Sequence, residues 1–227
     1  MTLPLAHVIF FLYLCAAFYA ERNKRNVNKL SNMKKGLSLI VVLGVLAIIA
    51  LWVVNVYNSL VELEENVENA WSQVENQYQR RADLVPNLVN TVKGYAKHEQ
   101  ETFTQTMEAR AKATQITIDP SNVTPQQLAD FQAAQGELSQ ALGRLLAVSE
   151  RYPELKADKS FLNLQSQLEG TENRCTVARQ QFNDTAKQYN VRVRRFPGNI
   201  IASMFGFEKK PYFEADEEAK KAPKVEF

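Results

Sequence analysis

The sequence predicts an all-α protein, in which an N-terminal transmembrane helix continues into an antiparallel up-and-down bundle of three to four long helices. Three observations lead to this prediction. Residues 36–54 (GLSLIVVLGVLAIIALWVV) form an apolar run without a charged side chain. The residues after 57 are rich in Ala, Gln, Glu and Leu, which favour helix, and the whole chain has only 8 Gly and 8 Pro. Apolar residues after 57 also recur every three or four positions, which is the spacing of one helix face.

The apolar run has the length and flanks of a membrane anchor. A helix rises about 1.5 Å per residue, so the run spans about 30 Å, the thickness of the hydrocarbon core of a bilayer. Lys34 and Lys35 precede it, and Trp52 and Tyr57 lie at its far end, where aromatic rings favour the membrane–water interface. We therefore expect a transmembrane anchor at residues 33–56, with the lipid bilayer as its partner. A buried core helix is the alternative, but the rest of the chain offers little that could surround it.

Residues 1–32 form an N-terminal extension that allows three interpretations. An apolar segment at 3–20 is followed by a basic one. We favour the interpretation that the natural protein starts at Met33, and that residues 1–32 result from a translation start assigned too far upstream. A first membrane segment is the second possibility, although Pro4 and His7 weaken it. A cleaved signal is the third, although its first residues lack the usual Lys or Arg.

The charges that flank the anchor predict its orientation. Basic residues lie before it, at 22, 24, 25, 29, 34 and 35, whereas acidic residues follow it at 62, 64, 65 and 68. Positively charged flanks stay in the cytoplasm, so we expect a single-pass cell-membrane protein whose bundle lies on the outer side.

The first helix after the anchor carries one apolar stripe, made of Leu60, Leu63, Val67, Trp71, Val74 and Tyr78. We expect one long helix to about Gln115, kinked at Pro86 because proline removes a backbone hydrogen bond. The alternative is a break, with a new helix capped by Asp83.

Two further helices and a tail complete the predicted bundle. Thr124-Pro125 is typical of a helix start, which predicts a second helix to about Glu150. A third helix is expected from about Ser160 to Phe196, and a short apolar segment at 199–207 should dock on the bundle. The bundle would thus occupy 57–207. The charged residues 208–227 lack a core pattern, so we expect a disordered tail.

The predicted lengths suggest self-association. A helix to Gln115 would be about 88 Å long and the second helix about 39 Å, so the second could not cover the membrane-proximal stripe. A bare apolar stripe usually marks a contact, which predicts a homo-oligomer or a partner helix. The alternative is a break near Asp83 and a self-contained four-helix bundle.

Several motifs resemble those of the LemA family of bacterial membrane proteins. They include AWSQ at 70–73, RRADLVPNLV at 80–89, VKGYA at 92–96 and YPELKA at 152–157. The resemblance covers about residues 33–213. It implies a single N-terminal membrane anchor followed by an all-helical, four-helix-type bundle, with an undefined biochemical role and with both membrane orientations having been discussed.

Arg81 and Glu172 are the candidate site residues. Each falls at or beside an apolar stripe, where a charged side chain is unfavourable unless it is paired. We expect an internal ion pair that fixes the register of the helices. The alternative is a polar pocket that recognises a ligand or partner.

No catalytic residue, cofactor or metal site is expected. His98-Glu99 invites a metal reading, but Tyr95 occupies the position where a bundle di-iron motif needs glutamate. Cys15 and Cys175 give no disulfide framework. The net charge is +2 without a broad basic face, so nucleic-acid binding is not expected.

A basic cluster precedes the apolar residues 200–207. It consists of Arg192, Arg194 and Arg195. It is typical of a last helical turn stabilised by the helix dipole, and the alternative is a patch that touches lipid headgroups.

Together these features predict a membrane-anchored helical scaffold or interaction protein of the cell envelope, without catalysis and self-assembling. The alternative is an accessory or sensor subunit of another envelope protein, such as a protease or transporter.

Overall fold

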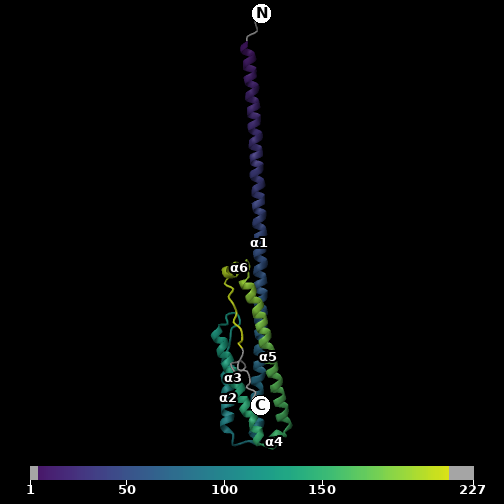
Figure 1. Cartoon of the computed structure of the whole chain (residues 1–227), viewed down its shortest axis with the longest axis vertical. Helices are drawn as coiled ribbons and strands as arrows, with labels where there is room; N and C mark the ends of the chain where they lie inside the picture. The colour runs from purple at the N-terminus through teal and green to yellow at the C-terminus, as the bar shows by residue number, and fades with distance from the viewer. Residues whose placement is uncertain (1–4, 215–227) are drawn as a thin grey trace, which may run out of the picture. The chain divides into compact units, whose positions relative to one another are not determined.

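A computed structural model describes the backbone of residues 5–214 and the side chains of residues 38–214. Residues 5–214 contain helices and no β-strand, which confirms the all-α prediction. The elements are α1 (Leu5–Tyr95), α2 (Gln100–Gln115), α3 (Pro125–Ala147), the 3-10 helix η1 (Val148–Arg151), α4 (Pro153–Lys156), α5 (Lys159–Arg194) and α6 (Gly198–Phe205) (Figure 1). The chain divides into two compact units, Met1–Asn55 and Val56–Phe227, which we describe separately as unit 1 and unit 2.

Unit 1 contains the apolar run of α1. The large apolar side chains between residues 39 and 51 are exposed on all sides of the helix. Within the part of the chain that the structure describes, the stretch Ser38–Tyr95 is the one helix long and apolar enough to cross a membrane. A helix that is apolar all round and is not covered by protein suits lipid, in agreement with the predicted anchor.

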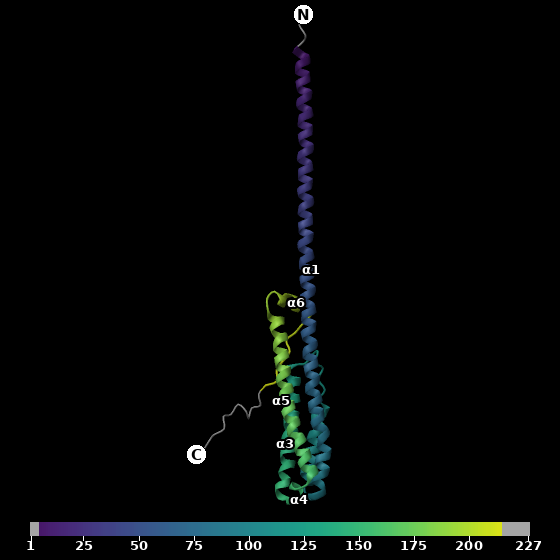
Figure 2. The same cartoon turned by 90° about the vertical axis from the view of Figure 1, so that its right-hand side faces the viewer.

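Unit 2 is an antiparallel four-helix bundle. Residues 56–95 of α1 lie side by side with α2, α3 and α5, and the chain alternates in direction from each helix to the next (Figures 1 and 2). Within this unit, α4 lies at the end where α1 turns into α2, and α6 lies at the other end. The bundle therefore has four helices side by side, as the upper limit of the prediction allowed.

The first helix ends earlier than the sequence suggested. It passes through Pro86 and stops at Tyr95, so the prediction of one helix to about Gln115 is wrong, and so is the alternative break near Asp83. A proline at 86 cannot donate to the carbonyl of Ala82, four residues earlier. In the fold, Arg110 Nε of α2 donates to that carbonyl at 2.8 Å. The returning helix thus satisfies the acceptor that the proline frees, and α1 continues.

The predicted starts of the later helices are close to the observed ones. Thr124 caps α3 by accepting from the backbone N–H of Gln127 at 3.2 Å, and the Gln127 side chain accepts from the Thr124 N–H at 2.9 Å. This reciprocal pair is a capping box. Asp158 caps α5 by accepting from Phe161 N–H at 2.8 Å. Local sequence signals therefore position both helices.

The four helices have unequal lengths. α2 has 16 residues, α3 has 23 and α5 has 36, which correspond to about 24, 35 and 54 Å. α2 and α3 therefore cannot cover α5 along its whole length. The missing cover comes from the C-terminal residues 207–214, which run back along α5 from α6 (Figures 1 and 2).

Two asparagines of α5 hold this extended segment. Asn190 exchanges two hydrogen bonds with the backbone of Lys210, at 2.8 and 2.9 Å, and Asn183 exchanges two with the backbone of Phe213, at 3.0 and 2.8 Å. Seven helical residues rise about 10.5 Å and three extended residues span about 10 Å, so the two periods match. The prediction of a disordered tail is therefore wrong for residues 208–214, because these side-chain amides satisfy its backbone. Residues 215–227 lie outside the described residues.

The apolar stripe of α1 is not bare. Leu60, Val67, Trp71 and Val74 are fully buried, Tyr78 is almost so, and Leu63 is half-buried. The Trp71 ring packs on Phe131, Phe182 and Phe213, with ring centroids 5.4 to 6.0 Å apart. The inference of a bare surface considered only the reach of the second helix. α5 and the returning C-terminal segment supply the rest of the cover, so this stripe is not available for self-association.

Replacing Phe213 by alanine tests the role of the C-terminal segment as part of the core. Phe213 is buried against Trp71 and Phe182. We expect Phe213→Ala to lower the free energy of unfolding by about 3 kcal/mol, measured by urea unfolding of the detergent-solubilised chain. The neighbouring Tyr212→Ala is the control and should cost less than about 1 kcal/mol, because Tyr212 is exposed. Equal effects would contradict the assignment.

Replacing Asn190 by alanine tests the backbone clamp. The change leaves the buried Lys210 N–H and C=O without their partners, so we expect a loss of about 2 kcal/mol. Hydrogen exchange of the 207–214 amides should accelerate. Asn173→Ala, an exposed position on the same helix, is the matched control and should leave that exchange unchanged. Unchanged protection in Asn190→Ala would refute the clamp.

Candidate functional site

Arg81 of α1 is the most deeply buried charged residue of the described bundle. Its side chain is 2% exposed, and Tyr78, Ala82 and Val85 beside it are buried too. Its place on the helix follows from spacing, because it lies three positions after Tyr78 and so on nearly the same face. Burying a guanidinium is unfavourable unless hydrogen bonds and an opposite charge replace the lost water.

Neighbouring helices supply those partners. Arg81 Nη1 donates to Ser139 Oγ at 2.9 Å and to Glu172 Oε2 at 2.6 Å. Nη2 donates to the side-chain oxygen of Gln135 at 2.6 Å and to its backbone carbonyl at 3.1 Å. The guanidinium carbon also lies 4.9 Å from the centre of the Tyr78 ring. Each of the two terminal nitrogens of the guanidinium thus donates two hydrogen bonds.

The network joins all four helices of the bundle. Gln135 of α3 accepts from Arg81 and donates through Nε2 to the carbonyl of Ala113 in α2 at 3.1 Å. Glu172 brings in α5. One side chain from α1 is therefore linked, directly or through one residue, to each of the other three helices.

The structure brings the two candidate site residues, Arg81 and Glu172, together. The pair is asymmetric, because the Arg81 side chain is 2% exposed and the Glu172 side chain 54%. Glu172 keeps much of its hydration, so its desolvation is modest, whereas Arg81 depends on its partners. This geometry suits a role in aligning helices, and it also places the pair at a surface.

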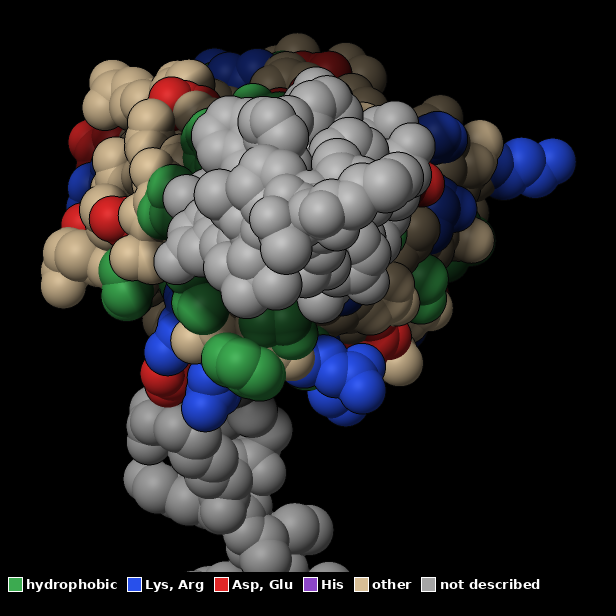
Figure 3. All heavy atoms as spheres, turned by 90° about the horizontal axis from the view of Figure 1, so that it is seen from above, with side chains coloured by type: hydrophobic (Ala, Val, Ile, Leu, Met, Phe, Trp, Pro, Cys, Tyr) green, Lys and Arg blue, Asp and Glu red, His purple; other side chains and the backbone are tan. Residues whose placement is uncertain are grey.

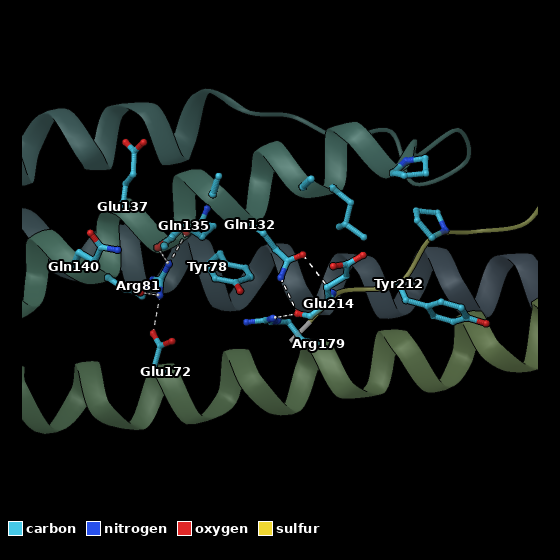
Figure 4. Close-up of a pocket in the computed structure, with 17 residues that line it drawn as sticks. Tyr78, Arg81, Gln132, Gln135, Glu137, Gln140, Glu172, Arg179, Tyr212 and Glu214 are labelled. Atoms are coloured by element: carbon cyan, nitrogen blue, oxygen red, sulfur yellow. Dashed lines mark hydrogen bonds and ion pairs between the residues drawn. The ribbon is translucent and has the colours of Figure 1, made fainter. Parts of the chain in front are cut away.

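That surface is a groove between α3 and α5, which both polar and apolar side chains line. It has a volume of about 1020 Å³, and Tyr78 and Arg81 of α1 form part of its lining. Figure 4 shows Gln132, Gln135, Glu137 and Gln140 on one side and Glu172 on the other. At one end the groove meets the C-terminal segment, where the carbonyl of Glu214 accepts from Gln132 and from Arg179, both at 3.0 Å.

The chemistry of the groove favours binding by hydrogen bonds. Among the described residues that line it there is no histidine and no cysteine. Burial raises the pKa of Tyr78 to about 12, so its hydroxyl stays protonated at neutral pH. Burial likewise raises the pKa of the nearby Cys175 thiol to about 11, which makes it a poor nucleophile. The groove thus offers amides, hydroxyls and carboxylates rather than a poised acid, base or nucleophile.

His98 and Glu99 lie elsewhere, in the turn between α1 and α2. His98 is exposed. Glu99 accepts from Arg151 Nη2 at 2.9 Å and from the Tyr152 hydroxyl at 3.5 Å. These bonds fasten this turn to the η1–α4 turn at the same end of the bundle, which is a structural role.

The sequence analysis did not predict a second buried cation, Lys210. Its side-chain nitrogen lies 2.7 Å from Glu64 Oε1 and donates to the carbonyl of Ser121 at 2.5 Å. It also lies 5.6 Å from the centre of the Tyr189 ring, and burial raises the pKa of Tyr189. The aromatic pair at 212–213 inside a charged tail was the sequence signal that could have indicated a packed segment.

A double-mutant cycle tests whether Arg81 and Glu172 are energetically coupled. We expect Arg81→Met to cost about 3 kcal/mol, because it leaves buried acceptors without a donor. Glu172→Gln should cost about 1–2 kcal/mol in the native background and much less in the Arg81→Met background, which gives a coupling of about 1–2 kcal/mol. Urea unfolding of the full chain provides the measurement.

The exposed pair of Lys112 and Glu137 is the matched control for this cycle. Its atoms are 3.2 Å apart, and both side chains are more than half exposed. We expect a coupling below about 0.5 kcal/mol there. A coupling at Arg81 and Glu172 that is no larger than this control would show that the buried pair does not align the helices.

Comparison with known proteins gives the family. The sequence model of the LemA family matches residues 70–227. The magnetosome protein MamQ 2 of Paramagnetospirillum magneticum is 29% identical over 195 residues, which cover 78% of this chain and 71% of the relative. MamQ of Magnetospirillum gryphiswaldense is 28% identical over 174 residues (69% and 64%), and the protein LemA of Metamycoplasma hominis is 24% identical over 160 residues (70% and 69%). Because the family model covers well over half of the sequence, the chain belongs to the LemA family.

Proposed function

We propose that this chain is a membrane-anchored scaffold of the cell envelope that self-assembles, and that its groove binds an extended polypeptide segment of a second copy. The anchor is the apolar run of α1. The bundle lies on the outer, periplasmic side of the inner membrane, because basic residues precede the run and acidic ones follow it. In this proposal the protein acts by binding and not by catalysis.

The groove carries the proposal because of what lies beside it. Directly adjoining it, the bundle already holds an extended segment of its own chain, and side-chain amides of Asn183 and Asn190 bond the backbone of that segment. The groove continues along α3, where the exposed amide of Gln140 lies beyond Gln132, whose amide already bonds Glu214. A second extended segment would find the same kind of partner there, through the backbone groups that every polypeptide has.

We therefore propose that self-assembly uses the groove, and not the apolar stripe of α1 that the sequence suggested. The stripe is buried inside unit 2, whereas the groove is open. The alternative function is that of an accessory or sensor subunit, in which the segment belongs to another envelope protein, such as a protease or transporter. The groove chemistry suits either source, and the experiment below separates them.

Photocross-linking from the groove in intact membranes tests the proposal. A photoreactive residue at Gln140, which lines the groove and is exposed, should link to one defined peptide of another polypeptide chain, identified by mass spectrometry. We expect that peptide to come from a second copy, distinguished by isotope labelling of one of two co-expressed populations.

The control is the same photoreactive residue at Val177, an exposed position of α5 outside the groove lining. It should give no such link. A peptide from a different envelope protein would favour the accessory subunit instead. Links only to residues 215–227 of the same molecule, or equal links from both positions, would contradict the proposal.

A further inference from the structure

α6 is apolar on the side that faces the bundle and also on the side that faces away. Ile201 and Ala202 are buried, whereas Ile200, Met204 and Phe205 are exposed by 51%, 72% and 53%. Phe196, just before the helix, is 77% exposed. A helix on the surface of a water-soluble domain normally presents polar residues to the solvent. Four large apolar side chains within ten residues therefore point to a partner surface.

The position of α6 in unit 2 identifies that surface. The Tyr57 ring packs edge-on against Phe205 and Phe207, with ring centroids 5.0 and 5.6 Å apart. Tyr57 belongs to α1 and follows the last residue of the apolar run, Val54, by three positions, or about 4.5 Å of helix. The contacts therefore hold α6 against a residue that follows the apolar run by three positions in the sequence.

Charges near α6 suit phospholipid headgroups. Arg194 and Arg195 precede the helix, Lys209 follows it, and all three are exposed, with Glu208 as the one exposed carboxylate between Arg194 and Lys209. Figure 3, seen from above relative to Figure 1, shows hydrophobic, basic and acidic side chains on the visible face around the grey atoms. Basic residues beside an apolar helix face are typical of segments that lie in the membrane interface.

We propose that residues 196–207 form a second membrane contact, in which the exposed side of α6 lies in the boundary between headgroups and acyl chains. The contact rests on the proposed anchor, which brings the patch to the bilayer. Its occupant is the lipid surface. A second copy of the chain is the competing occupant, but a membrane so close to the patch leaves little room for another bundle.

Spin-label accessibility in nanodiscs tests this contact. A label at Met204→Cys is placed in the full chain with Cys15→Ser and Cys175→Ala, reconstituted in phosphatidylcholine mixed with phosphatidylglycerol. Oxygen concentrates in lipid and a nickel chelate stays in water. We expect the Met204→Cys label to collide preferentially with oxygen, and the Ile200→Cys label to do the same. Val177→Cys, which is 62% exposed on α5, is the control and should prefer the nickel chelate.

A label at Leu46→Cys, in the apolar run, reports the anchor independently. If the Leu46→Cys label prefers oxygen while both α6 labels behave like the one at Val177→Cys, the inference fails and the anchor stands. If the Leu46→Cys label also prefers nickel, the anchor fails and the inference fails with it. Labels on α6 that are shielded from both reagents and show dipolar broadening between copies would overturn the lipid contact in favour of a second chain.

Discussion

The burial of Arg81 is the constraint on which the arrangement of the bundle depends. A guanidinium in the interior needs hydrogen-bond acceptors, and here the acceptors of its two terminal nitrogens come from α3 and α5. Sliding any of these helices by one turn, about 5.4 Å, would move those acceptors out of reach. Well-packed apolar residues can be as stabilising as a buried ion pair, so we propose that the network contributes mainly by selecting one alignment of the helices.

With the helices aligned at Arg81, their unequal lengths determine which part of the α1 stripe they cover and which part needs another cover. α2 and α3 pack where the network lies and end well before α5 does. The part of the α1 stripe at the α6 end would then face water, and Trp71 would keep only Phe131 of α3 and Phe182 of α5 against its ring. An extended segment covers them at the expense of its own backbone hydrogen bonds, and Asn183 and Asn190 restore these bonds. The C-terminal segment is therefore as much a part of the core as any helix.

Much of this fold could be predicted from local patterns, and the errors share one cause. Helical periodicity, the Thr124 cap and the pairing of Arg81 with Glu172 depend on residue types at short spacings or on simple charge balance. The continuation of α1 past Pro86 is different, because Arg110 of α2 bonds the carbonyl of Ala82 that the proline frees. The packed segment 208–214 was missed because its average composition is charged, while one residue, Phe213, carries the burial. In both cases the deciding contact lies far away in the sequence.

The polar groups in the groove follow from the same constraint. Acceptors for Arg81 must be polar, so the neighbouring turns of α3 and α5 carry Gln135, Ser139 and Glu172 where an ordinary bundle would have apolar residues. These three residues and Arg81 all line the groove. The residues that align the helices therefore also leave a surface of hydrogen-bonding groups beside a segment that is already held through its backbone. The residues that pair with Arg81 are thus also the ones that give the groove its hydrogen-bonding groups, and that link is why we propose this groove as the interaction surface of the protein.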